Sequence, residues 1–245
     1  MKGKDYIETI NSIPFKMIFV KGGTVTIEYD KEKTAITVPD FHLAETPVTQ
    51  ELWRAVMGKD PERLGFKGHD KRPVEQVSWL DIVEGNTATK APAFLQQLNE
   101  SNQLKFKDYQ LSSEAMWQFA AQGGNLSKGY PYSGSNHLKE VGWHGKNSHG
   151  ETKPIKLKLP NELGFYDMSG NIWELCQDKW MSDVKRIPQN GLPNKLVDRE
   201  DRYIDLRVLR GGSWYYLGYD YRIHFRNYIF SHFRDNDIGV RLSRY

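Results

Sequence analysis

The sequence has little cysteine: Cys176 is the single thiol among 245 residues. One cysteine cannot form an internal disulfide or build a multi-cysteine zinc or iron–sulfur site. Long apolar runs are also missing, since no stretch approaches the eighteen or so apolar residues that a membrane span needs. The start, MKGKDYIETINSIPF, has two lysines with no apolar segment behind them. We therefore expect no membrane span and see no secretion signal.

A large excess of charge of one sign is lacking as well. The 34 basic and 31 acidic residues give a net charge of +3, and no block of lysine or arginine stands out. Nucleic acid is therefore not an expected partner. The 7 histidines show no HxxxH or HExxH spacing, which would place two ring nitrogens on one helical face. No histidine metal centre is expected.

Aromatic residues are abundant instead. They make up 13% of the chain, with 7 Trp and 13 Tyr, although the mean hydropathy is −0.67. The 21 glycines and 11 prolines indicate a chain rich in loops. The rings must therefore fill a core between irregular segments or form a displayed surface.

Local patterns predict strands within the first forty residues and three helical regions after them. Alternating apolar residues in PFKMIFVKGGTVTIEYD are typical of antiparallel strands. Thr49, Ser78 and Ser113 stand where helix N-caps belong. KAPAFLQQLNE resumes the helical pattern of WLDIVEG after GNTATK, so this region reads as one helix that is either interrupted or preceded by a small insertion. Residues 130–155 read as a long loop that is either functional or held by something other than regular ladders, such as packed Trp side chains or a metal. Residues 181–203 read as a polar surface excursion.

Several motifs occur in a recognisable order: ETPVTQELWRAVMG, RPVEQVSWLDI, YQLSSEAMWQFAAQGG, NELGFYDMSGNIWELCQDKW, VLRGGSW and IGVRLSRY. From about residue 40 to the C-terminus the chain resembles the formylglycine-generating enzyme/sulfatase-modifying family. The resemblance implies a single α+β domain over 1–245 with a C-type lectin-like fold, a small twisted antiparallel sheet, a few helices and many loops. Fold alone does not decide function.

The two cysteines that carry the oxidative chemistry of that family are missing from the position where the resemblance places them. Its oxygen-dependent enzymes carry two copper-binding cysteines shortly after the GGS motif, where this chain reads GGSWYYLGYDYRIHFR. A phenol cannot replace a thiolate as nucleophile or soft-metal ligand at neutral pH. We therefore expect no copper and no enzyme activity. Cys176 is interpreted as a small buried hydrophobe rather than a catalyst.

The C-terminal segment also resembles the variable region of diversity-generating retroelement target proteins, through the spacing of Trp214, Arg222, Arg226 and Arg234. In those proteins, adenines of asparagine codons are randomised, which cannot yield Lys, Glu, Gln, Met or Trp. Apart from its arginines, segment 215–237 contains none of these five types. Residues 210–241 are therefore interpreted as a ligand-binding variable region. Packing of a tyrosine-rich loop is the alternative.

The chemistry of this segment independently favours a binding surface. Large rigid rings beside short polar residues are typical of paratopes. The candidate ligand-binding residues are Tyr215, Tyr216, Leu217, Tyr219, Asp220, Phe225, Asn227, Tyr228, Ile229, Phe230, His232, Asp235, Asn236 and Asp237. We expect all of them except Leu217, Ile229 and Asp237 to have substantially exposed side chains, with the three arginines pointing inward and Trp214, Ile223 and Ile238 in the core.

The resemblance further implies a structural calcium site in GFYDMSGNIWE. It maps to the side chains of Asp167 and Glu174 and the carbonyls of Gly170 and Ile172, which are hard oxygen ligands. Capping of local turns by the two carboxylates is the alternative.

Two functions follow as hypotheses. The first is a non-enzymatic protein whose C-terminal face recognises a protein or glycan receptor on another cell or host surface. The second is a divergent sulfatase-modifying enzyme. The sequence leaves the cellular location of the protein open. The resemblance implies display on a surface or association with a phage.

Overall fold

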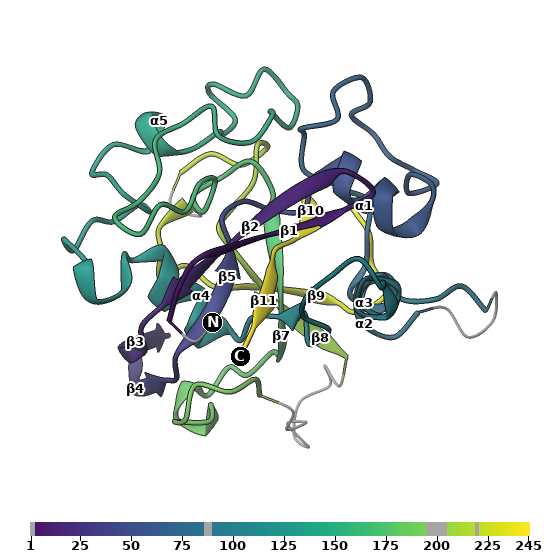
Figure 1. Cartoon of the computed structure of the whole chain (residues 1–245). Helices are drawn as coiled ribbons and strands as arrows, with labels where there is room; N and C mark the ends of the chain where they lie inside the picture. The colour runs from purple at the N-terminus through teal and green to yellow at the C-terminus, as the bar shows by residue number, and fades with distance from the viewer. Residues whose placement is uncertain (1–2, 86–89, 195–204, 219–220) are drawn as a thin grey trace.

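The computed structural model describes residues 3–85, 90–194, 205–218 and 221–245. Three sheets, several short helices and long loops form the fold (Figure 1). This agrees with the expected α+β architecture. None of the helices in the described ranges has the length and apolar character required to cross a membrane.

A five-stranded sheet joins the two ends of the chain. Its order is β1 (Tyr6–Ile10), β2 (Ile13–Val20), β5 (Phe41–Ala44), β11 (Leu242–Arg244) and β6 (Gln110–Leu111). Every neighbouring pair in it is antiparallel. Asn11 and Ser12 connect β1 to β2 with positive φ angles of 47° and 67°, which is the geometry of a tight hairpin turn. The C-terminal strand therefore lies inside a sheet that the N-terminus begins.

A four-stranded sheet carries the C-terminal segment. Its order is β10 (Ile238–Val240), β7 (Trp173–Lys179), β8 (Leu206–Arg210) and β9 (Asn227–Phe230), and a separate hairpin pairs β3 (Gly23–Tyr29) with β4 (Glu32–Val38). β10 and β7 run parallel, while the other pairs are antiparallel. The expected small antiparallel sheet is thus divided into several sheets with one parallel pair. Strand β9 arises within the segment interpreted as variable.

The helices are α1 (Gln50–Met57), α2 (Trp79–Val83), α3 (Phe94–Glu100), α4 (Glu114–Ala121) and α5 (Leu138–Val141), with 3-10 turns η1 (Gly124–Leu126) and η2 (Val184–Arg186). Three of the described helices, α1, α2 and α4, begin where the capping residues predict. Thr49, Ser78 and Ser113 each accept a backbone N–H of the first turn. The second helical region is two separate helices, α2 and α3. Residues 86–89 of the intervening insertion lie outside the described residues.

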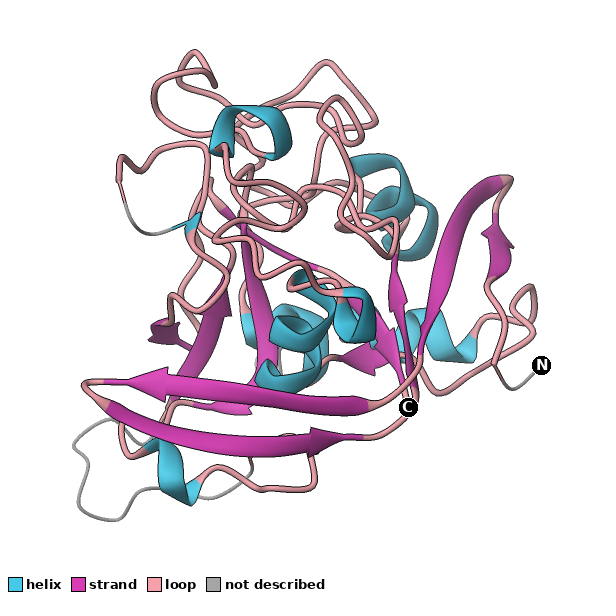
Figure 2. Cartoon of the chain, turned by 90° about the vertical axis from the view of Figure 1, so that its left-hand side faces the viewer, coloured by secondary structure: helices cyan, strands magenta, loops and turns pink. Residues whose placement is uncertain are grey.

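The long loops stack on one side of the sheets, where Figure 2 shows them crossing above α4 and the long β3–β4 hairpin. Helix α4 is buried along its whole length, because its eight residues pack between this hairpin and strands β7 and β8. Residues 181–194 only partly form the polar surface excursion that was expected, and residues 195–203 of that prediction lie outside the described residues. Met181, Val184 and Ile187 are buried in the same hydrophobic cluster as α4, because apolar positions within this polar stretch close over the core.

Candidate ligand-binding face

A buried ion-pair network underlies the C-terminal segment. Arg226 donates from Nε and Nη2 to the two carboxylate oxygens of Glu114, at 2.7 and 2.8 Å. Arg210 donates to Glu114 at 3.3 Å and to the carbonyl of Ile223 at 2.6 Å. Burial acts to raise the pKa of Glu114, but the charge and hydrogen bonds of Arg226, with the charge of Arg210, outweigh it and lower that pKa. The network holds loop backbone, such as that of Ile223, which is not hydrogen-bonded to a neighbouring strand.

A second buried pair lies beside the first. Arg241 donates from Nη2 to Oε1 of Glu174 at 2.7 Å and from Nε to Oε2 at 2.9 Å. Trp117 of α4 donates its indole N–H to the same carboxylate at 2.7 Å. Arg241 also donates to the carbonyls of Ala44 and Tyr166. One guanidinium therefore connects the C-terminal strand to β5 and to the loop before β7.

The displayed part of the segment has two groups of exposed rings. Tyr215 is 66% exposed, and Tyr216 and Leu217 beside it are also exposed. On β9 and its following turn, Tyr228 and Phe230 are 41% and 46% exposed, and His232 and Asp235 are open to solvent. Half-buried members of the candidate set are Phe225, Asn227, Ile229 and Asn236. Tyr219 and Asp220 lie outside the described residues.

Several expectations about this segment are wrong, beginning with Phe225, Asn227 and Asn236, which are half-buried instead of exposed. The candidate ligand-binding residue Asp237 is buried, and its carboxylate accepts a hydrogen bond of 2.7 Å from Ser213 at the start of the segment. Arg234 does not point inward: its side chain is 40% exposed and binds Asp81 of α2 through two bonds of 2.6 Å. Arg222 is half-buried, and Arg226 alone of the three is fully inward. The core positions Trp214, Ile223 and Ile238 are confirmed as buried.

The loop at 142–148 supports the first group of rings. Gly145 donates its N–H to the carbonyl of Tyr216 at 2.9 Å, and Ser148 donates its hydroxyl to the carbonyl of Trp214 at 2.9 Å. Tyr221, fully buried, donates its hydroxyl to the same Tyr216 carbonyl. The exposed tyrosines thus extend from backbone that is held on several sides, as a preorganised binding surface requires.

Sequence reasoning missed the neighbours of the second group. Trp180 packs against Tyr228 with ring centroids 4.7 Å apart and against Tyr29 of the β3–β4 hairpin at 5.2 Å. A hollow of about 300 Å³ lies between this hairpin and residues 224–226. Phe233, within the segment but not in the candidate set, is 46% exposed. Trp180 and Tyr29 carry no sequence signal of this role, because only folding brings the hairpin to β9.

Glu75 holds a loop against the base of the first group. Its Oε1 accepts the backbone N–H groups of Gly65 and Phe66 at 2.7 and 2.9 Å. Phe66 then packs edge-on against Trp214, with ring centroids 5.2 Å apart. Burial raises the pKa of Glu75 from 4.5 to about 7, although the two N–H groups oppose the rise. The carboxyl is therefore protonated in the folded chain at mildly acidic pH.

This shift predicts a pH dependence of stability. The folded-state pKa of Glu75 lies above the unfolded one, so its contribution is complete below pH 4.5 and lost as pH rises through about 7. Glu75→Gln keeps an acceptor for both N–H groups without the charge. We expect it to stabilise the protein by roughly 1–3 kcal/mol at pH 8 and by little at pH 5. Thermal melts at both pH values measure this, with exposed Glu62→Gln as the control; equal effects at the two pH values would refute it.

The four residues implied for calcium do not fit a calcium shell as a set. Both oxygens of Glu174 are engaged by Arg241 and Trp117. Asp167 is buried and accepts the backbone N–H of Lys156 at 3.1 Å. The described residues contain no group of three or more His, Cys, Asp or Glu side chains that could hold a metal ion. A calcium ion would have to displace Arg241, which already supplies the positive charge.

The resemblance implies calcium binding at Asp167, Gly170, Ile172 and Glu174, and a melting experiment can test it. Because an ion that binds only the folded state raises the melting temperature, millimolar calcium and EDTA should give different melting curves if the site exists. Since Arg241 and Trp117 already occupy the carboxylate of Glu174, we expect superimposable curves. A rise that EDTA reverses would show that the ion replaces the guanidinium.

Cys176 has no reactive environment. It is fully buried on β7, and burial, with the charges of Asp178 and Glu114, holds its pKa well above the ordinary value. The thiolate, not the thiol, is the nucleophile and the copper ligand, and this environment disfavours the thiolate. The expected burial of Cys176 is confirmed.

The comparisons with known proteins agree with this architecture. Residues 8–245 match the family described as "Sulfatase-modifying factor enzyme 1-like domain", so the chain belongs to that family, and the match begins well before residue 40. "Treponema denticola variable protein 1" superimposes with a TM-score of 0.77 at 27% identity, covering 98% of each chain. PvdO from Pseudomonas aeruginosa has the same TM-score at 19% identity, which supports the fold alone.

Curated relatives carry different names. The "Chaperone protein LppX" of Paenibacillus barcinonensis is 31% identical, and the match covers 81% of this chain and 78% of that protein. A "Formylglycine-generating enzyme" of Thermomonospora curvata is 31% identical over 66% of this chain. The chain spans only 52% of that enzyme's length. The proteins to which this chain is similar are thus named as enzymes, as a chaperone and as a variable protein.

Proposed function

We propose that this protein is a non-enzymatic binding protein that recognises a protein or glycan receptor through its C-terminal face. The observation that carries the proposal is the pair of exposed ring groups, around Tyr215 and around Tyr228, on backbone fixed by the buried Glu114–Arg226 pair. Exposed apolar rings are unfavourable in water at roughly 25 cal/mol per Å², so a displayed set of them is typical of an interaction site.

The composition of the segment and the structural likeness to a protein titled "variable protein" support the same function. The displayed residues can change with little effect on the core, because the buried contacts are made by Trp214, Tyr221, Arg226 and Asp237. A fixed frame with a changeable surface is what a diversified receptor-binding protein requires.

A divergent sulfatase-modifying enzyme is the competing function. It draws support from the family and from the named enzyme relatives. Against it stand the tyrosines in place of the two expected cysteines and the buried position of Cys176. Oxidation of a cysteine-containing peptide by the purified protein with added copper would favour this function over receptor binding.

The genome offers a direct test of diversification. We expect a near-copy of the last hundred or so bases of the gene, differing from it at adenines, next to a reverse transcriptase gene. Absence of such a copy in the source genome would contradict diversification of residues 210–241 by a retroelement and would leave the exposed face to be explained.

Substitution tolerance tests the separation of frame from surface. Randomising Tyr215, Leu217, Tyr228, Phe230 and His232 should leave protease resistance close to wild type, since surface changes alter stability by about 0.5 kcal/mol or less. Randomising the fully buried Tyr221 and Arg226 should eliminate most resistant variants. Protease selection of a displayed library, followed by sequencing, measures both; equal depletion at the two sets would contradict the proposal.

A further inference from the structure

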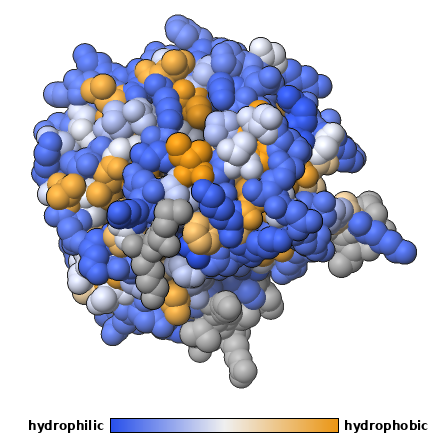
Figure 3. Space-filling view, viewed as in Figure 1, coloured by the Kyte–Doolittle hydropathy of each residue, from blue (hydrophilic) through white to orange (hydrophobic). Residues whose placement is uncertain are grey.

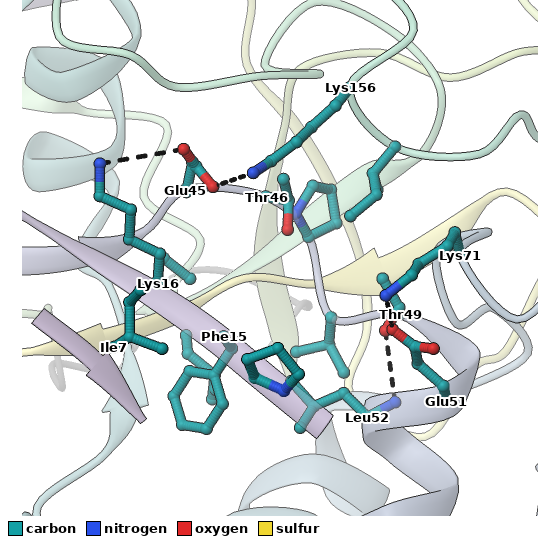
Figure 4. Close-up of a pocket in the computed structure, with 16 residues that line it drawn as sticks. Ile7, Phe15, Lys16, Glu45, Thr46, Thr49, Glu51, Leu52, Lys71 and Lys156 are labelled. Atoms are coloured by element: carbon teal, nitrogen blue, oxygen red, sulfur yellow. Dashed lines mark hydrogen bonds and ion pairs between the residues drawn. The ribbon is translucent and has the colours of Figure 1, made fainter. Parts of the chain in front are cut away.

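The larger of two hollows lies beside β1 and β2 and has a volume of about 490 Å³. In Figure 4, Lys16 and Lys156 both point toward Glu45, while Lys71 pairs with Glu51. Among the described residues that line it, no buried side-chain nitrogen or oxygen lacks a hydrogen-bond partner. Figure 3, drawn from the side of Figure 1, shows hydrophobic residues lying among hydrophilic ones. Nothing about this larger hollow therefore points to a particular ligand.

The smaller hollow, of about 300 Å³ between the β3–β4 hairpin and residues 224–226, has a buried donor without an acceptor. Arg226 lines this hollow, and its side chain is only 1% exposed. Its Nε and Nη2 atoms bind Glu114, so Nη1 lies at the opposite edge of the planar guanidinium. Nη1 is buried and has no hydrogen-bond partner among the described residues. An unmade bond of a buried charged group is unfavourable, so an acceptor from a ligand would stabilise this donor.

Aromatic rings form part of the wall of the smaller hollow. Tyr29, at the end of β3, is 36% exposed, and Phe225 opposite the hairpin is half-buried. Tyr29 packs edge-on against Trp180, with an angle of 89° between the ring planes. Its ring centroid lies 5.4 Å from the Cζ atom of Arg226. The Tyr29 ring is therefore held in place with part of its surface open to solvent, and such a ring attracts the polarised C–H groups of a ligand.

The charges that line the smaller hollow balance one another. Its lining holds two carboxylates and two ammonium groups, those of Glu28, Asp30, Lys31 and Lys33. Glu28 and Lys33 form an ion pair of 2.8 Å, and the charge of Arg226 is balanced by Glu114. Partial burial lowers the pKa of His224, so its ring is neutral at pH 7. A charged ligand would find no excess of the opposite charge here, so the lining favours a neutral ligand that both donates and accepts hydrogen bonds.

The backbone at this place is unsuited to an extended peptide. Asp30 and Lys31 join β3 to β4 with positive φ angles of 44° and 69°, which is the geometry of a two-residue hairpin turn. The hollow lies at this turn, where the β3–β4 ladder ends, so an added strand would have few backbone groups to pair with. Side chains therefore supply the hydrogen bonds of this site, which suits a compact ligand rather than a strand.

Building on the proposed receptor-binding function, on which this inference rests, we propose that the smaller hollow binds a neutral sugar residue of a glycan receptor. One face of the sugar ring, which presents C–H groups, lies against Tyr29. Its hydroxyl groups both donate and accept, so they bond to Glu28, Lys33 and the open donor of Arg226. The hairpin thus takes part in recognition beside the segment interpreted as variable.

The probes are the methyl glycosides of glucose, galactose, mannose and N-acetylglucosamine. A capped glycine–serine tetrapeptide serves as a neutral probe that hydrogen-bonds but lacks a sugar ring. Saturation-transfer NMR with the full chain should show at least one glycoside binding at millimolar concentration, with the strongest transfer to its ring C–H protons. The tetrapeptide should show no transfer. Binding of none of the glycosides, or equal transfer to the tetrapeptide, would overturn the proposal.

Variants of the hairpin locate the contact. Tyr29→Leu removes the ring and should weaken sugar binding about tenfold, whereas Tyr29→Phe keeps the ring and should preserve it. Glu28→Gln should also weaken binding, because it replaces a charged acceptor. The matched control is Glu32→Gln, which changes a carboxylate of the same hairpin that pairs with Lys185 outside the hollow. If Tyr29→Leu fails to fold, Glu28→Gln still decides; unchanged affinity in both would reject the site.

Two further measurements test the donor and the position of the site. In protein with nitrogen-labelled arginine, the Nη1 resonance of Arg226 should shift when the glycoside saturates the protein, and an unchanged resonance would contradict its role as a donor to the sugar. Tyr215→Ser, in the first ring group, should leave glycoside binding intact; a loss would place the sugar there and overturn this site. Protease selection of the displayed library uses no sugar, so failure of the glycosides alone rejects only this inference, whereas equal depletion in that selection rejects the receptor-binding function beneath it.

Discussion

Replacing Arg241 with methionine is expected to destabilise the protein by about 3–5 kcal/mol, because it leaves the carboxylate of Glu174 buried without its ion-pair partner. Both side chains of the pair are 1% exposed, so water cannot compensate. The carbonyls of Ala44 and Tyr166 lose their donor in the same change. Urea unfolding followed by tryptophan fluorescence measures the loss.

A matched control lies three residues further along the chain. Arg244, half-buried, pairs with the exposed side chain of Asp108, and Arg244→Met should cost about 1 kcal/mol, less than at Arg241, since an ion pair that water reaches contributes little. The double variant Arg241→Met with Glu174→Gln removes both charges and keeps an acceptor for Trp117. It should recover a large part of the loss. Arg241→Met and Arg244→Met could lower the free energy of unfolding by similar amounts, or the double variant could recover none of the loss. Either result would show that the Glu174–Arg241 pair is not a principal source of stability.

Gly170→Ala is expected to destabilise the protein by several kcal/mol, by strain and by collision. Gly170 has a φ of +104°, and a Cβ there would overlap the carbonyl oxygen of Trp143. The loop from residue 142 to 148 would have to move, and with it the support of the Trp214 and Tyr216 carbonyls. Thermal melting and near-ultraviolet circular dichroism would record the loss and the change in aromatic packing.

Gly150→Ala separates the two causes. Gly150 also has a positive φ, of +76°, but no atom lies within 4 Å of a Cβ placed there. It should therefore cost about 1–2 kcal/mol from backbone strain alone. Equal losses of stability in Gly170→Ala and Gly150→Ala would mean that a Cβ at residue 170 does not collide with the carbonyl oxygen of Trp143. The resemblance implies a calcium-binding role for Gly170. The structure explains the glycine sterically instead, because a side chain at this position would collide with the carbonyl of Trp143.

Much of the fold follows from local sequence signals. The capping hydroxyls at Thr49, Ser78 and Ser113 start helices because each satisfies an open N–H, and this needs only neighbouring residues. Alternation of apolar residues likewise predicted the early strands. The paratope-like composition of 215–237 indicated a displayed segment, and exposed Tyr215, Tyr228 and Phe230 are in it.

Contacts between distant segments required the tertiary structure. Glu114 and Arg226 are 112 residues apart, and Glu174 and Arg241 are 67 apart, so no periodicity could pair them. The same limit accounts for the placement of two residues of the C-terminal segment: Arg234 binds Asp81 and Asp237 binds Ser213, partners that only folding brings into range. Sequence by itself determined which residue types were available for a core and a surface. The three-dimensional arrangement decided which charges are buried in pairs, and thereby which rings remain exposed, because long-range electrostatic and packing contacts depend on distances that the sequence does not state.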